Sequence, residues 1–118
     1  MLVRGIRGAI TVKENTKKDI LADTKELLLI LKKSNDFSIE DIVSIFFSTT
    51  LDLDSAFPAA AARELGWSGV PLFGMQEANV QIGLKKCIRI LIQINCEKKQ
   101  SEIKHCYLRE AKNLRKDL

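Results

Sequence analysis

Apolar and polar residues alternate along three stretches of the chain, and this pattern predicts β-strands. Residues 2–12 alternate with a period of two, and glycines among them allow another element to approach closely. The run IVSIFFST at 42–49 is rich in β-branched and aromatic residues, which favours a central strand. Residues 85–96 and 103–110 also alternate, and VPLF at 70–73 predicts a short strand limited by its proline.

Two helices are predicted between the strands. Residues 17–33 carry apolar side chains at helical spacing and follow Thr16-Lys17-Lys18-Asp19, which resembles a capping box. A shorter helix is predicted over 58–65, where Pro58 suits a first helical position and the following Gly66 a helix end. A second capping pattern at 38–41 predicts a turn, and residues 74–83 show no regular pattern.

The order of these elements indicates one α+β domain, residues 1–118, with the helices on one face of a mixed sheet. The helices cover one face at most, and the other face carries Arg7 or Arg89 among apolar residues. No segment remains to cover that second face. We therefore expect the chain to self-associate through it.

Arg89 is an unusual residue for its position. In KKCIRILIQIN, residues 85–95, isoleucines occupy one face of the strand, whereas Arg89 lies between Cys87 and Leu91 on the other. A buried guanidinium group is costly unless it is paired. Its partner is either a carboxylate of the same protein, such as Glu77, or a ligand from solution. The pattern leaves both interpretations open.

Charge and composition narrow the functional classes only modestly. The net charge of +4 mildly favours anionic partners. There is no long basic run and no interleaving of aromatic with basic residues, so a nucleic-acid partner is not expected. No apolar run approaches the roughly 18 residues that span a membrane, and the N-terminus is typical of a strand rather than a signal peptide.

The cysteines indicate a reducing compartment, and we expect the cytoplasm. Cys87, Cys96 and Cys106 are odd in number and lack C-x-x-C spacing, which argues against a disulfide framework and against a zinc site. His105 and Cys106 are neighbours, but adjacent residues of a strand point to opposite faces. They are therefore not expected to share a metal ion.

Six polar residues lie in apolar strand or loop contexts and form the candidate site: Arg7, Arg63, Glu77, Arg89, Tyr107 and Arg115. The sequence shows no nucleophilic triad, no glycine-rich phosphate loop and no pair of carboxylates for hydrolysis. Several cations with one carboxylate and one phenol suit a small dianion and charge that develops during a reaction. Each residue also has an ordinary interpretation, such as a solvated arginine on a helix.

Six motifs in the same order along the chain resemble a known family. They are RGIRGAITV, FPAAAAREL, MQE, GLKKCIRI, HCYLREA and LRKDL. Together they resemble the monofunctional chorismate mutases of the AroH class over essentially the whole chain. The resemblance implies a homotrimer whose sheets pack centrally as a pseudo-α/β barrel, with active sites between subunits. It also implies the Claisen rearrangement of chorismate to prephenate, on the branch leading to phenylalanine and tyrosine, without a cofactor or metal.

The resemblance also assigns roles to residues. Arg89 matches the donor to the ether oxygen of the breaking bond, and Glu77 matches the acceptor from the ring hydroxyl. Arg7 and Tyr107 match groups that hold the substrate carboxylates. Further substrate-binding positions lie on the rim, the walls and the tail: Arg63, Phe57, Ala59, Phe73, Gly74, Leu114 and Arg115.

Three positions depart from the family pattern. Gly74 stands where Cys or Ser is frequent, Ala60 where a lysine can occur, and Lys116 where a proline is frequent. Two other functions are weighed against the mutase. One is an imine deaminase of the Rid type, which also forms trimers with an arginine between subunits. The other is a non-catalytic trimer that binds a small aromatic or dicarboxylate ligand.

Overall fold

The computed structural model describes residues 2–80 and 83–114. Their strands form one mixed sheet in the order β3-β2-β4-β1-β5. β4 pairs antiparallel with β1 and β2, whereas the outer strands β5 and β3 pair parallel with β1 and β2. The elements are β1 (Leu2–Thr11), α1 (Lys17–Asn35), η1 (Ile39–Asp41), β2 (Ile42–Thr49), α2 (Ala59–Glu64), β3 (Leu72–Gln76), β4 (Cys87–Cys96), η2 (Gln100–Glu102), β5 (Cys106–Leu108) and η3 (Arg109–Asn113), where η marks a 3₁₀ helix.

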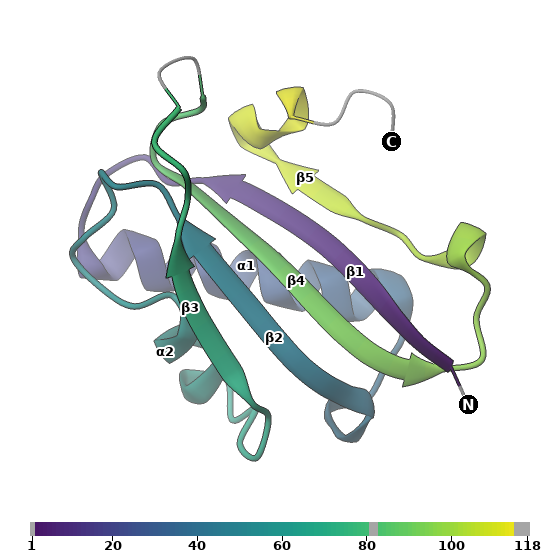
Figure 1. Cartoon of the computed structure of the whole chain (residues 1–118). Helices are drawn as coiled ribbons and strands as arrows, with labels where there is room; N and C mark the ends of the chain where they lie inside the picture. The colour runs from purple at the N-terminus through teal and green to yellow at the C-terminus, as the bar shows by residue number, and fades with distance from the viewer. Residues whose placement is uncertain (1, 81–82, 115–118) are drawn as a thin grey trace.

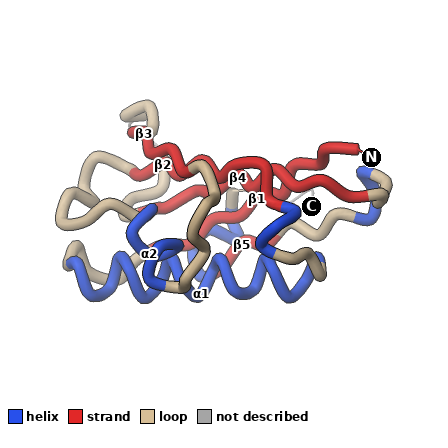
Figure 2. Tube along the Cα trace, turned by 90° about the horizontal axis from the view of Figure 1, so that it is seen from below, coloured by secondary structure: helices blue, strands red, loops and turns tan. Residues whose placement is uncertain are grey.

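The predicted α+β arrangement is confirmed. α1 and α2 lie in a layer on one face of the sheet, as the views in Figures 1 and 2 show together. The isoleucines of β4 point into the core between sheet and helices and are at most 3% exposed. They meet a fully buried set from α1 that includes Leu27, Leu28 and Leu31. Strand alternation on one side and helical spacing on the other therefore build one core.

Local signals fix the ends of the long helix. The Thr16 hydroxyl oxygen accepts a hydrogen bond from the backbone N–H of Asp19 at 3.1 Å, as the capping pattern predicts. The helix runs to Asn35, two residues beyond the predicted end. It stops at Asp36, which adopts a left-handed φ of 48°. The predicted turn is also present, with Ser38 and Asp41 bonded to each other around η1.

Two strand predictions are wrong in their limits. The short strand predicted at 70–73 is β3, Leu72–Gln76, so part of the segment predicted to be irregular belongs to the sheet. β3 is an edge strand exposed along most of its length, so its sequence lacks the apolar alternation used for the prediction. The strand predicted over 103–110 is reduced to Cys106–Leu108, because Arg109 takes a left-handed φ of 57° and starts η3.

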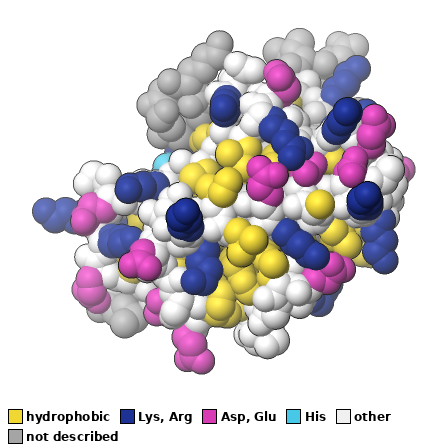
Figure 3. Space-filling model, turned by 180° about the vertical axis from the view of Figure 1, so that it is seen from behind, with side chains coloured by type: hydrophobic (Ala, Val, Ile, Leu, Met, Phe, Trp, Pro, Cys, Tyr) yellow, Lys and Arg dark blue, Asp and Glu magenta, His cyan; other side chains and the backbone are white. Residues whose placement is uncertain are grey.

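The helix-bearing side of the molecule carries charges of both signs. Basic and acidic side chains are interspersed with small apolar patches on this side (Figure 3). Lys25 of α1 and Glu64 of α2 form an ion pair at 2.6 Å. Among the described residues, no helix is both long and apolar enough to cross a bilayer.

Gly8 lies where side chains of α1 pack closely on β1. A Cβ built on Gly8 would lie 2.8 Å from the Leu31 Cδ1 atom, 3.2 Å from Leu27 Cδ1 and 3.3 Å from the Cys106 carbonyl oxygen. Both leucines are fully buried and have little room to move. The absence of a side chain at Gly8 therefore sets how closely α1 packs on the sheet.

We predict that Gly8→Ala destabilises the protein by about 1–3 kcal/mol, because the added methyl group overpacks the α1 contact. Urea unfolding followed by circular dichroism measures this change. Gly74→Ala is the matched control, since a Cβ at Gly74 would meet no described atom within 4 Å. We expect its free energy of unfolding to stay within about 1 kcal/mol of the parent. Equal stability of both variants would contradict the packing role of Gly8.

Candidate active site

The open face of the sheet, opposite the helices, carries polar and apolar side chains in two rows across the strands. Paired positions on all five strands make up the first row: Met75, Ser48, Arg89, Ala9 and Tyr107. The neighbouring row is Phe73, Phe46, Leu91 and Arg7. Strand register, rather than sequence proximity, therefore brings Arg89, Arg7 and Tyr107 onto one surface.

Arg89 has a carboxylate partner within the chain. Its Nε atom lies 2.9 Å from the Oε2 atom of Glu77, which follows directly after β3. The hydroxyl of Ser48 donates to the same oxygen at 2.6 Å. The Arg89 side chain is nevertheless 50% exposed in the single chain. Its face of the sheet has no cover at this point among the described residues.

Arg7 is positioned by a contact from the segment before β5. Its backbone N–H donates to the Nδ1 atom of His105 at 2.9 Å. This bond extends the pairing of β1 with β5 by one position beyond the paired residues Gly8–Ile10. The bond requires Nδ1 to be unprotonated, so the imidazole acts here as an acceptor toward the backbone. His105 is thus a structural support of the site that the sequence analysis did not find.

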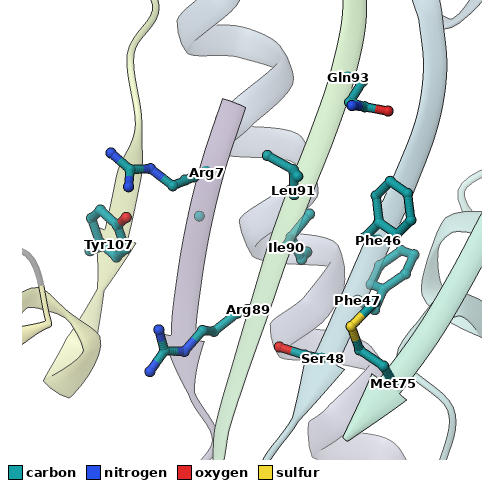
Figure 4. Close-up of a pocket in the computed structure, with 11 residues that line it drawn as sticks. Arg7, Phe46, Phe47, Ser48, Met75, Arg89, Ile90, Leu91, Gln93 and Tyr107 are labelled. Carbon is teal, nitrogen blue, oxygen red and sulfur yellow. The ribbon is translucent and has the colours of Figure 1, made fainter. Parts of the chain in front are cut away.

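These side chains line a cavity of about 560 Å³ on the open face. Arg7 and Arg89 extend toward the side where Tyr107 lies, while Phe46 and Met75 stand across from them (Figure 4). Glu77 joins this group through its contact with Arg89. We call Arg7, Glu77, Arg89 and Tyr107 the cationic cluster. It combines two positive charges, one carboxylate and one phenol.

A small apolar cluster lies beside Arg89 on the same face. Ala9, Cys87 and Ala111 are almost completely buried there, with Tyr107 and Leu114 packed against them. Ala111 belongs to η3, which crosses this end of the sheet. Burial raises the pKa of the Cys87 thiol to about 11, although the nearby Arg89 charge opposes this shift. Cys87 is therefore a neutral packing group at neutral pH rather than a nucleophile.

Four of the predicted substrate-binding residues line a different cavity. Phe57, Ala59, Arg63 and Gly74 surround a space of about 750 Å³ between α2 and the edge strand β3. We call these four residues the helix-side cluster. Phe57 is 81% exposed, and the space next to Gly74 is open. In one chain, this cluster and the cationic cluster therefore belong to separate cavities.

The remaining predicted residues take different places. Phe73 lies on the open face, 60% exposed, in an edge-to-face contact with Phe46 at a centroid distance of 6.0 Å. Leu114 packs on the small apolar cluster. Ala60 lines the helix-side cavity. Arg115 and Lys116 lie outside the described residues.

Two polar residues of the open face were missed by the sequence analysis. Ser48 binds Glu77, and Gln93 lines the cavity while its amide oxygen accepts from Ser44 at 2.7 Å. Both could have been found from alternation, which places them on the polar face of β2 and β4. Their hydrogen-bond partners could not have been predicted from the sequence pattern, because those contacts depend on the order of the strands in the sheet.

Comparisons with known proteins agree over nearly the full chain. The family model for chorismate mutase type I matches residues 3–118. Chorismate mutase AroH of Bacillus subtilis (strain 168) is 46% identical, covering 100% of this chain and 94% of the relative. The AroH protein of Thermus thermophilus is 47% identical, covering 99% and 97% respectively.

A solved structure agrees with the fold as well. The chorismate mutase from Clostridium thermocellum superposes with a TM-score of 0.91 at 46% sequence identity, covering 92% of this chain and 97% of that one. Sequence and fold therefore agree on one family, and the chain belongs to the chorismate mutases of type I.

Proposed function

We propose that this chorismate mutase converts chorismate to prephenate at sites shared between neighbouring copies of a homotrimer. The observation that carries the proposal is the division of the expected site residues between two cavities of one chain. The cationic cluster lines the open face, whereas the helix-side cluster lines the space beside α2. A ring of copies can bring the first cluster of one subunit against the second cluster of the next.

The exposed apolar side chains support this assembly. Val3, Phe73, Met75 and Leu91 on the open face are between 36% and 60% exposed. Phe46 pairs with Phe73 on one side and with Leu91 on the other, so these side chains form an apolar surface of the type that subunit interfaces bury. A second copy would also exclude water around Arg89, where a less polar environment strengthens its interaction with a developing negative charge.

The chemistry of the two clusters fits a unimolecular rearrangement. Such a reaction needs no nucleophile and no proton transfer, so the protein contributes by holding the compact conformer and stabilising charge. We assign Arg89 to the ether oxygen, Glu77 to the ring hydroxyl, and Arg7 and Tyr107 to the substrate carboxylates. Phe57, Ala59, Arg63, Phe73, Gly74 and Leu114 form the walls and rim, and Arg115 is assigned to the tail.

The alternatives differ from this proposal in what they predict. Membership of the chorismate mutase family argues against an imine deaminase. A non-catalytic trimer would bind an aromatic dicarboxylate without turnover, and Gly74 is the departure that favours it, because a side chain is missing where relatives use one. The cytoplasm remains our proposed location, in keeping with the free state of all three cysteines.

We predict that Arg89→Lys lowers kcat for chorismate by at least about 100-fold, because one ammonium group cannot reproduce the guanidinium fork at the ether oxygen. The loss of chorismate absorbance in the ultraviolet measures the rate, and Arg89→Ala serves as the reference for complete loss. Near-normal kcat in the lysine variant would remove Arg89 from the reaction. A folded parent protein without any turnover would favour the non-catalytic alternative.

We predict that two inactive variants restore activity when they are refolded together. Arg89→Ala disables the cationic cluster and Arg63→Glu disables the helix-side cluster. In mixed rings, about a quarter of the sites then combine two intact halves, and activity should return to about that fraction of the parent. Each variant refolded alone is the control. No recovery in mixed oligomers, confirmed as mixed by mass spectrometry, would show that the site does not combine two copies.

A further inference from the structure

Tyr107 is carried by the weakest strand of the sheet. β5 has only three residues, lies at the edge, and pairs with β1 alone, at Gly8–Ile10 (Figure 1). So short an edge strand has few backbone hydrogen bonds to hold it in place. The phenol of Tyr107 therefore depends on further contacts for a fixed position in the cationic cluster.

The residue that ends β5 is held in an uncommon conformation. Arg109 has a φ of 57°, a left-handed value that costs a non-glycine residue free energy and persists only when its surroundings enforce it. The chain turns here from the edge of the sheet into η3. That helix then crosses the open face and buries Ala111 on Ala9 and Cys87.

A network around the Arg109 side chain enforces this turn. Its guanidinium forms a two-pronged pair with Asp23 of α1, Nη1 to Oδ2 at 2.7 Å and Nη2 to Oδ1 at 2.9 Å. Nη1 also donates to the carbonyl oxygen of Thr11 at 3.1 Å, and Nη2 to Glu26 at 3.2 Å. The backbone N–H of Glu110 donates to the Thr11 hydroxyl at 3.2 Å. The turn is thus tied to α1 and to the end of β1.

Asp23 makes this pair more than a surface contact. The Asp23 side chain is 12% exposed, whereas the Glu26 side chain in the same cluster is 47% exposed. A carboxylate so deeply placed needs its cationic partner, and it raises the pKa of Arg109 through their hydrogen bonds. The network reaches the edge of the sheet from the helix side, while Tyr107 two residues earlier faces the cavity on the open side.

We propose that Asp23 and Arg109 are positioning residues that fix the turn after β5 and thereby hold Tyr107 and Leu114 beside Arg89. Neither residue lines the cavity of the cationic cluster. Their effect is transmitted through the backbone between Tyr107 and Arg109. The proposal extends the proposed function, because Tyr107 is assigned there to a substrate carboxylate.

A kinetic test separates positioning from general stability. Asp23→Asn keeps the size of the side chain and removes its charge, while Arg109→Lys keeps the charge and removes the fork. We expect each to raise KM for chorismate about tenfold with a smaller change in kcat. In a Tyr107→Phe background, Asp23→Asn should change KM less than about twofold, because it acts through the same phenol. Glu26→Gln, an exposed member of the cluster, should leave both constants within about twofold.

A spectroscopic test does not depend on turnover. Tyr107 is the one tyrosine of the chain, so 3-fluorotyrosine labelling places a single fluorine probe at this position. Well below the unfolding temperature, the fluorine resonance should shift or broaden in Asp23→Asn and Arg109→Lys and stay unchanged in Glu26→Gln. A parent protein without activity would refute the proposed function, and this comparison would still decide the role of the pair.

Two results would overturn the inference. The first is an unchanged fluorine resonance in both variants that break the pair, whatever their thermal stability. The second is a rise in KM that is equally large with Tyr107 and with Phe at that position. Either result would mean that the pair stabilises the fold without positioning the phenol.

Discussion

The charge of Arg89 has to be accommodated at the centre of a β-sheet, and much of the open face is arranged around it. Its strand is bordered on both sides by others, so the guanidinium cannot reach solvent around an edge. Glu77 pairs with one side of it, and the Ser48 hydroxyl donates a hydrogen bond to the same Glu77 oxygen. Neither α1 nor α2 covers this face of the sheet, so the other side of the guanidinium group is accessible to a ligand.

This constraint divides the sheet into two functional faces. On the helix side, isoleucines and leucines form a dry core, and Gly8 permits the close approach of α1. On the open side, each strand contributes one or two chemically distinct side chains to the rows around Arg89. Because side chains alternate along β1 and β4, each of these strands places its core residues on one face and its candidate site residues on the other. A rigid core can then hold polar groups in place without sharing residues with them.

Much of this arrangement could be predicted from the sequence, because periodicity reports directly which side of an element is buried. This periodicity predicts β1, β2 and α1, and it predicts the open face that carries Arg7 and Arg89. β3 and β5 do not, since edge strands are half exposed and their limits are set by pairing partners distant in the chain. The left-handed turn at Arg109 has no signal at all in a residue type that rarely adopts it. The contact of Glu77 with Arg89 was one of two options that pattern could not separate.

The balance of free energies favours a site that combines both cavities for the proposed reaction. Even a modest enzyme lowers a barrier by about 8 kcal/mol, and one well-placed donor supplies roughly 3–4 kcal/mol. On the proposed assignment, Arg89 would supply at most about half of this, and conformational restraint would supply the remainder. Restraint requires walls on opposite sides of the substrate, whereas the cationic cluster lies on one open surface. Among the described residues, the predicted wall and rim residues Phe57, Ala59 and Arg63 lie beside α2, around the open space at Gly74. Because these walls border a separate cavity, a second copy is the economical way to bring both halves around one molecule.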